Sequence, residues 1–242
     1  HGFISRPYDA VQNAMAGCYI LEEHPLACWQ NPAVSGRGVE ISGSFLYSLP
    51  ELPLAIACYS TSIRKWGFSL SHSSLLHPLL KQNLSLVGVN YGNEFLAGGL
   101  ALSFINYTYH DRGKFSAFSL NSGFYWQLGI FKSGFSCHNI LQSRLGSATL
   151  PVLYSYETRL QLPGNVIIGC GLEKETGYDF SLRFASSISI TKFLKLFTGY
   201  QYNPDRIGTG IMIILRNYHL CYSVRNHQIL PYTHYLSISY VF

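Results

Sequence analysis

From Val39 to the end of the chain, apolar and polar residues alternate with a period of two, in runs of about ten residues. Between 179 and 191, for example, Ser181 and Arg183 alternate with Leu182 and Phe184. Each run ends at Gly, Pro, Asn or Asp, which are turn residues. The pattern predicts fourteen strands, near 39–49, 53–62, 65–74, 81–91, 94–110, 114–127, 129–140, 150–162, 165–176, 179–191, 194–203, 207–217, 218–228 and 233–242.

The two faces of these strands differ in character. Between 150 and 162, Glu157 and Arg159 share one face, whereas Tyr156 and Leu160 share the other. A polar interior with an apolar exterior is typical of a membrane barrel, and a soluble barrel of this size would have the reverse. We therefore predict an all-β fold, a closed antiparallel transmembrane β-barrel of fourteen strands with short loops. Twelve strands is the alternative, if 53–74 or 207–228 is wrongly divided.

The last ten residues predict the strand that closes this barrel against the strand near Val39. One face of it carries His234 together with Leu236, Ile238, Tyr240 and Phe242. In water such an edge would promote aggregation, but in a bilayer it can face lipid. A terminal aromatic after alternating apolar residues also resembles the signal by which the barrel-assembly machinery recognises bacterial outer-membrane proteins. We expect that machinery to insert the chain.

Residues 1–38 lack the alternation. The stretch Arg6 to Gly17 could form a short helix, with Pro7 at its start and Gly17 after its end. We divide the chain into an N-terminal plug or periplasmic segment, 1–38, and a transmembrane β-barrel, 39–242. Because His1 is followed by neither a basic nor a long apolar leader, we interpret the sequence as a mature form from which a signal peptide has been removed.

Composition supports a membrane location. Charged residues make up 12% of the chain, about half the ~25% of soluble domains. A soluble all-β protein, the alternative, would have too few charges to cover its surface. No apolar run reaches the ~18 residues that a transmembrane helix needs. The net charge of +5 is scattered, so we expect no nucleic-acid partner. These features favour the bacterial outer membrane, with lipid around the wall.

Six cysteines show no spacing typical of a metal site. Cys18 and Cys28 lie close in sequence and could form a disulfide in an oxidising periplasm, or remain two buried thiols. The sequence predicts no cofactor, no metal and no catalytic residues.

The N-terminal segment carries short motifs of a known family. Its Ala14-Met15-Ala16-Gly17 stretch, the Trp29-Gln30-Asn31-Pro32-Ala33 stretch and the ending of the chain together resemble the FadL/PorV-like outer-membrane family. That family includes long-chain fatty-acid transporters and PorV-like subunits of type IX protein secretion. The resemblance implies a fourteen-stranded barrel with an N-terminal segment in its lumen. Ala16 stands where a glycine is usual.

Charged residues that the alternation places inside the barrel form a predicted network. Opposite charges on neighbouring strands could plug the interior as ion pairs or line a selective pore, and we favour the plug. The members of this network are Glu40, Glu157, Arg159, Glu173, Arg183 and Arg216.

Three functions compete. The first is a non-enzymatic accessory subunit of a larger outer-membrane complex for protein secretion, assembly or surface export. Its partner would be a larger barrel or lipoprotein subunits, and the short loops favour it. The second is a FadL-like carrier of small hydrophobic molecules, with 1–38 as the plug. The third is a lipid-modifying hydrolase acting through His234 on the lipid face, for which the sequence offers no paired Ser and orienting residue.

Overall fold

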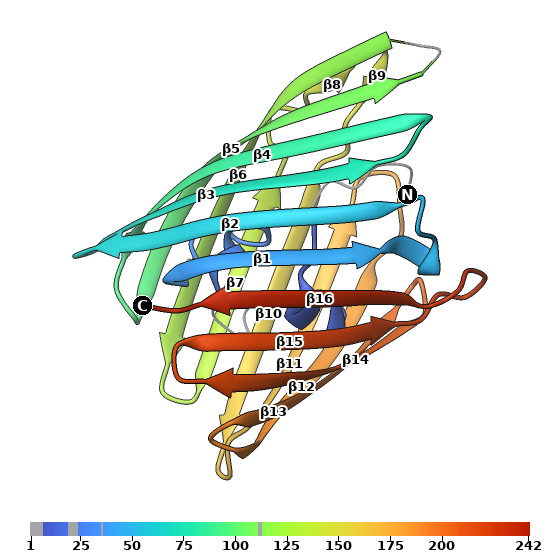
Figure 1. The fold of residues 1–242 in the computed structure, drawn as a ribbon. Helices are drawn as coiled ribbons and strands as arrows, with labels where there is room; N and C mark the ends of the chain where they lie inside the picture. The colour runs from blue at the N-terminus through green and yellow to red at the C-terminus, as the bar shows by residue number, and fades with distance from the viewer. Residues whose placement is uncertain (1–6, 19–23, 35, 111–112) are drawn as a thin grey trace.

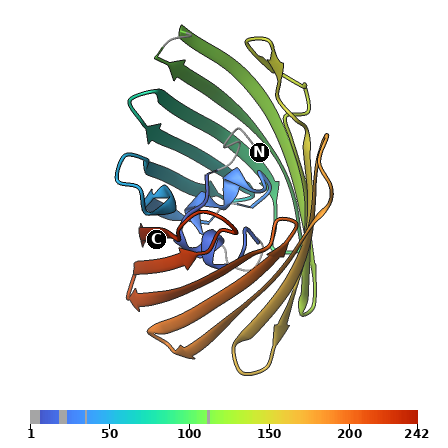
Figure 2. The same ribbon diagram turned by 90° about the vertical axis from the view of Figure 1, so that its right-hand side faces the viewer.

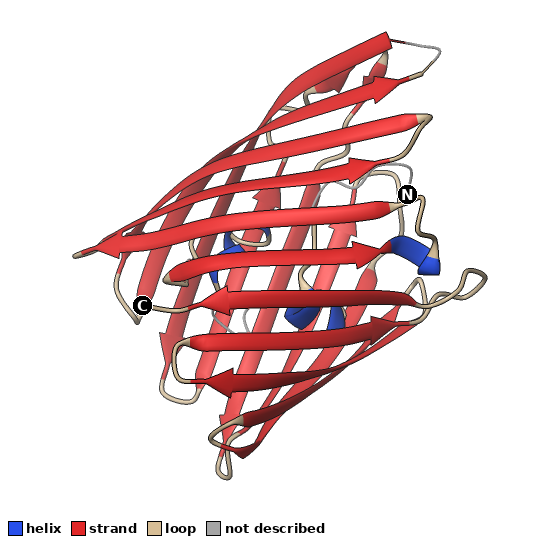
Figure 3. Cartoon of the chain, in the orientation of Figure 1, coloured by secondary structure: helices blue, strands red, loops and turns tan. Residues whose placement is uncertain are grey.

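The computed structural model describes residues 7–18, 24–34, 36–110 and 113–242. Within them, fourteen antiparallel strands form a closed barrel, so the predicted fold and strand number are confirmed and the twelve-strand alternative is wrong (Figures 1 and 3). The wall strands are β1 (Gly38–Phe45), β2 (Pro53–Ile63), β3 (Trp66–Leu76), β4 (Leu80–Gly92), β5 (Leu96–Tyr109), β6 (Gly113–Leu128), β7 (Phe131–His138), β10 (Leu153–Leu162), β11 (Val166–Glu175), β12 (Ser181–Thr191), β13 (Leu194–Tyr202), β14 (Arg206–Leu215), β15 (Tyr218–Arg225) and β16 (Thr233–Tyr240).

The barrel closes between its first and last strands. Strands β1 and β16 pair in a register that runs from Val39 opposite Tyr240 to Phe45 opposite His234. Every other wall strand pairs with its neighbours in the chain, and β7 pairs with β10. The predicted role of the last strand as the closing seam is therefore confirmed.

Side chains alternate across the wall as the sequence indicates. On β1, Glu40 and Ser42 face inward and are each 2% exposed, whereas the outward Ile41 is 64% exposed. On β16, the outward Leu236 and Ile238 are about half exposed. Apolar groups on this outer face are stable against lipid, not against water. No helix in the described residues is long and apolar enough to span a membrane.

Two connections depart from the sequence prediction. The strand expected at 39–49 ends at Phe45, because Tyr47 and Ser48 take positive φ angles of 57° and 58° in the short 3₁₀ helix η2 (Leu46–Ser48). Between β7 and β10, the chain forms a separate hairpin of β8 (Arg144–Leu145) and β9 (Ala148–Thr149). Neither feature has the period-two pattern that marks the wall.

The two ends of the barrel differ in the length of their connections. Turns of two residues, such as the one between Ile63 and Trp66, lie at the end where β1 begins and β16 finishes. The longer connections 46–52, 139–152 and 226–232 lie at the other end. Bacterial barrels place short turns in the periplasm and longer loops outside, so the first end is periplasmic and the second extracellular.

The described residues of the N-terminal segment, 7–18 and 24–34, lie inside the barrel, where Figure 2 shows them in blue among the strands. They contain the helix α1 (Ala10–Ala14) and the 3₁₀ helix η1 (Pro25–Trp29). Asp9 caps α1 by accepting a 2.6 Å hydrogen bond from the Gln12 backbone N–H. The helix expected from Arg6 to Gly17 is therefore shorter, and its expected start at Arg6 lies outside the described residues. All five residues of α1 are buried.

The extracellular loop 226–232 packs against η2, beside the extracellular end of the seam between β1 and β16. The ring of His227 packs edge-on against Tyr47, with 4.6 Å between ring centroids, and Ser48 donates a 2.7 Å hydrogen bond to the Tyr232 carbonyl. Burial and the neighbouring charges of Arg206 and Arg225 lower the pKa of His227 from 6.5 to about 4. His227 is therefore neutral while the loop is closed.

We expect acid to loosen this loop. When the loop opens, the pKa of His227 returns toward 6.5, so the open form binds a proton between pH 6.5 and 4 and the closed form does not. The stability of the closed loop is complete above pH 6.5 and falls as pH drops toward 4. The protection factors of the 226–232 amides, which are the intrinsic exchange rates divided by the observed rates, measure this when they are compared at pH 7 and pH 5. His227→Gln should remove the acid-dependent part of the exchange, and an unchanged dependence would contradict the prediction.

Candidate functional site

The second arm of the N-terminal segment, residues 24–34, lies against β5 and β6, where the wall has glycine residues. A Cβ atom at Gly99 would overlap the carbonyl group of Pro32, and one at Gly123 would overlap the side chain of Asn31. Asn31 Nδ2 donates 3.2 Å hydrogen bonds to the carbonyls of Phe124 and Phe135 on β6 and β7. The predicted motif residues Asn31 and Pro32 therefore lie directly against the backbone of the wall.

The first arm, residues 7–18, lies against β13 and β14 on the opposite side of the lumen. At Gly199 of β13, a Cβ atom would lie 2.5 Å from the Met15 carbonyl carbon, and at Gly210 of β14 it would lie 2.8 Å from the Ala14 Cβ. The Ala10 backbone N–H donates a 2.9 Å hydrogen bond to Ser237 of β16. All eight predicted motif residues, Ala14, Met15, Ala16, Gly17, Trp29, Asn31, Pro32 and Ala33, are buried inside the barrel. The described N-terminal residues thus contact two sides of the lumen, and we call them the plug.

A buried ion pair anchors the first arm of the plug. Arg183 of β12 contacts Glu173 of β11 at 2.5 Å and lies 4.0 Å from Glu157 of β10. Its guanidinium also donates to the Gly17 carbonyl at 3.3 Å and to the Tyr8 hydroxyl at 3.5 Å. Arg183 therefore balances the charge of two wall carboxylates and also binds the chain just after α1.

The predicted lumen charges do not form a single network. Glu157, Glu173 and Arg183 are together, whereas Glu40 faces a different cluster near the seam. Arg159 is half-buried on β10. Arg216 lies apart and exposed, since β14 ends at Leu215 and Arg216 takes a φ of 56° in the following turn. Its expected place in the lumen is therefore corrected.

A luminal pocket of about 410 Å³ lies between the plug and the extracellular loops. Trp29 of the plug forms part of its lining and donates a 2.7 Å hydrogen bond to Ser71 Oγ. The apolar walls come from Ile105 and Tyr107 of β5, with Leu150 and Leu153 before and on β10. These residues face inward, where the rule of a polar interior predicts hydrophilic side chains.

The sequence interpretation missed this pocket. Its signal is a local exception to the alternation, because apolar residues stand at inward positions of β5 and at 150 and 153. Such exceptions could have been found by marking inward apolar residues strand by strand. What could not be found is that the separate stretches meet around Trp29, which depends on where the plug folds back.

No protein-family model matches the sequence, and no curated protein matches it either. Solved structures do match. The deltaS2 mutant of TodX, a monoaromatic hydrocarbon channel, gives a TM-score of 0.74 over 99% of this chain and 100% of its own, at 9% identity. The toluene transporter TodX of Pseudomonas putida gives 0.68 over 98% of each chain, at 9% identity. A FadL homologue of Pseudomonas aeruginosa gives 0.65 over 97% of this chain and 98% of its own, at 10% identity.

The chain has the fold of a FadL-like outer-membrane barrel. The resemblance seen in the sequence motifs is confirmed at the level of fold, and so is the predicted outer-membrane location. These neighbours are channels and transporters, which agrees better with the carrier hypothesis than with the accessory-subunit hypothesis that we placed first.

In this FadL-like barrel all six cysteines are free thiols, so Cys18 and Cys28 form no disulfide. Cys28 lies instead within hydrogen-bonding reach of Cys58 on β2. Cys18, the nearest cysteine to Cys28 in the sequence, is therefore not its partner, because η1 places Cys28 against β2.

The barrel's outer face shows no complete hydrolase triad in the described residues. His234 Nδ1 lies 2.7 Å from the Tyr222 hydroxyl and has no serine partner. His72 Nδ1 lies 2.9 Å from Ser85 Oγ, but no described residue orients the other side of its ring. A catalytic His needs such an orienting partner, so the geometry gives the hydrolase hypothesis no support.

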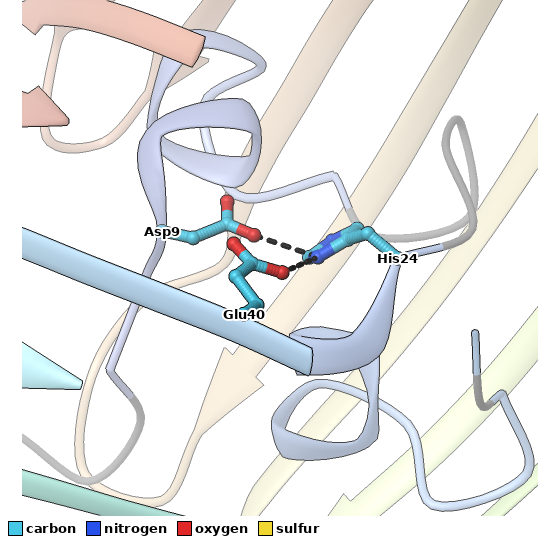
Figure 4. Close-up of side chains that lie close together, drawn as sticks. All are labelled: Asp9, His24 and Glu40. Atoms are coloured by element: carbon cyan, nitrogen blue, oxygen red, sulfur yellow. Dashed lines mark hydrogen bonds and ion pairs between the residues drawn. The ribbon is translucent and has the colours of Figure 1, made fainter. Parts of the chain in front are cut away.

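A second buried cluster links the plug to the wall near the seam (Figure 4). His24, at the start of η1, directs Nδ1 between Asp9 of the plug and Glu40 of β1. The distances are 2.6 Å to Asp9 Oδ2 and 3.3 Å to Glu40 Oε2. The sequence analysis placed Glu40 in the lumen, but nothing in the spacing of the three residues predicts that they meet.

Proposed function

We propose that this protein carries small, uncharged hydrophobic molecules across the outer membrane. The main support for this proposal is the luminal pocket, which could hold such a molecule. Its volume of about 410 Å³ falls in the ~300–1,000 Å³ range of small-molecule sites, and such sites combine apolar walls with a few polar groups. A barrel that serves only as a structural subunit has no need of an apolar cavity in a polar lumen.

The lining indicates the class of solute. Ile105, Tyr107 and Trp29 offer aliphatic and aromatic surface, and Asn121 and His138 add polar groups. This arrangement suits a neutral molecule of about one or two rings, since flat solutes gain most from contact with aromatic side chains.

Two acidic residues lie on the extracellular side of the pocket. Glu175 lines the pocket, and it also lines a neighbouring extracellular cleft of about 240 Å³ with Asp179. Like charges repel across such short distances. We therefore expect neutral solutes to be preferred over fatty acids and other carboxylates. The names of the structural neighbours, a monoaromatic hydrocarbon channel and a toluene transporter, agree with this class.

Filling the pocket should slow uptake. Ile105→Trp places a larger side chain at an inward position that lines the pocket, so less of the cavity is left for a solute. We expect transport to be slower by about fivefold or more, the effect of ~1 kcal/mol of lost solute binding. The measurement is the uptake rate of a neutral monoaromatic solute into proteoliposomes that contain only this chain.

Phe104→Trp is the matched control, because Phe104 is the adjacent residue on β5 and faces lipid at 36% exposure. It should transport at the wild-type rate. Equal rates for the two variants would contradict the assignment of the pocket. A wild-type barrel that transports nothing alone, and purifies in stoichiometric complex with a larger barrel, would instead support the accessory-subunit hypothesis.

A further inference from the structure

The Asp9–His24–Glu40 cluster has the composition of a metal site. Its ligand atoms, two carboxylate oxygens and one imidazole nitrogen, lie within 4.8 Å of one another, and all three residues are buried. Donors held at ~2.1 Å around a tetrahedral metal ion are about 3.4 Å apart. The 3.3 Å separation between His24 Nδ1 and Glu40 Oε2 matches that spacing, whereas the 2.6 Å separation between His24 Nδ1 and Asp9 Oδ2 is shorter and would lengthen by a side-chain rotation when an ion binds.

Hydrogen bonds alone leave this cluster incomplete. Nδ1 of His24 carries at most one N–H, so it can donate to only one of the two carboxylates. The contact with Asp9 Oδ2 lacks hydrogen-bond geometry, and this oxygen has no hydrogen-bond partner in the described part of the chain. Asp9 is 0% exposed and Glu40 is 2% exposed, so bulk solvent does not reach these carboxylates. Two buried carboxylates side by side need a shared proton or a cation.

We propose that the cluster binds one divalent transition-metal ion. One imidazole with two carboxylates suits Mn²⁺, Fe²⁺ or Zn²⁺ better than Ca²⁺ or Mg²⁺, which take oxygen ligands, or Cu⁺, which takes sulfur. The ion's two positive charges balance the two carboxylates while His24 stays neutral. A cavity of about 40 Å³, lined by His24 and Glu40, is large enough for one water molecule as a further ligand.

The ligands come from three separate segments, which gives the ion a structural role. Asp9 caps α1 in the first arm of the plug, His24 begins η1 in the second arm, and Glu40 belongs to the strand that closes the barrel. One ion would therefore clamp both arms of the plug to the seam. The cavity beside it is also lined by Lys195 of β13. This inference does not depend on the proposed transport function.

The test is a titration with Mn²⁺, followed by electron paramagnetic resonance, of the 242-residue chain purified in detergent and stripped with a chelator. Mn²⁺ is chosen because the six thiols compete for it much less than for Zn²⁺. We expect one bound Mn²⁺ per chain and a higher thermal unfolding midpoint when it is bound.

Two conservative variants remove ligands. Glu40→Gln keeps the shape of the side chain, and Asp9→Asn keeps a good helix N-cap, so both barrels should fold. Loss of a second-sphere group alone weakens metal sites 10–100-fold, so loss of a ligand should weaken Mn²⁺ binding by about 100-fold or more. Glu51→Gln, at an exposed position in an extracellular loop, is the control and should bind as the wild type does.

Several outcomes would overturn the proposal. One is a wild-type chain that takes up less than one Mn²⁺ with no change in its unfolding midpoint, which would mean that the carboxylates share a proton. Another is a Glu40→Gln variant that binds as tightly as the wild type. Should a variant fail to fold, the stoichiometry and the Mn²⁺-dependent midpoint of the wild type still decide the question.

Discussion

Replacing Arg183 by methionine is expected to lower the free energy of unfolding by about 3–5 kcal/mol, the usual cost of removing one partner from a buried ion pair. Its side chain is 3% exposed, beside Glu157 at 2% and Glu173 at 14%. Without the guanidinium, these two carboxylates lose their shared positive partner, and the Gly17 carbonyl loses a donor. Methionine keeps most of the volume, so the effect reports charge and hydrogen bonding rather than a cavity.

The measurement is the urea-induced unfolding transition of the barrel in phospholipid vesicles. Arg144→Met is the control, since Arg144 is exposed in β8 of the extracellular hairpin. Exposed ion pairs contribute about 0–1 kcal/mol, so this variant should stay within that range. If Arg183→Met were no less stable than Arg144→Met, Arg183 would not be the anchor that its contacts indicate.

Adding one methyl group to the wall at Gly99 is expected to unseat the plug. A Cβ atom there would overlap the Pro32 carbonyl group and lie 2.6 Å from the Ala33 nitrogen. These are backbone atoms, which cannot turn aside as a flexible side chain can. Overpacking costs about 1–3 kcal/mol where the structure can absorb it. Here the simplest relief is for the second arm of the plug to leave the wall.

Gly98→Ala provides a matched control on the same strand. Its Cβ would meet only the Gly123 carbonyl oxygen, at 4.0 Å, and it points away from the plug. Labelling of Cys28 by a membrane-impermeant maleimide, located by peptide mass spectrometry, reports the position of the plug, because Cys28 is 1% exposed when the plug is seated. We expect labelling in Gly99→Ala and none in Gly98→Ala or the wild type. Protection of Cys28 in all three proteins would show that the wall yields instead.

The wall of the barrel could be predicted closely from the sequence. The expected strand 179–191 is β12 (Ser181–Thr191), and the inward Arg183 and outward Phe184 are as the alternation indicates. The errors lie at the ends of strands, as at Arg216, where the period-two pattern continues into a turn. A turn is set by a few backbone angles, which leave little trace in the alternation.

The candidate site was predicted much less well. The motif around Asn31 and Pro32 pointed to the plug, but the sequence did not show that Gly99 and Gly123 form its seat, since a glycine in a strand has several possible roles. The order of the function hypotheses has a related explanation. Short loops favoured an accessory subunit, whereas the apolar pocket that favours a carrier forms only when the hairpin at 139–152 and the plug close around β5.

The sequence by itself predicted the strands of the wall, the face that most of their side chains occupy and the seam between β1 and β16. These are local properties, because a strand points successive side chains to opposite faces whatever its neighbours are. Only the tertiary structure decided which inward side chains meet. Asp9, His24 and Glu40 converge because a non-repetitive segment folds back into the lumen against the first strand. That placement depends on close packing between distant segments, which no periodicity along the chain records.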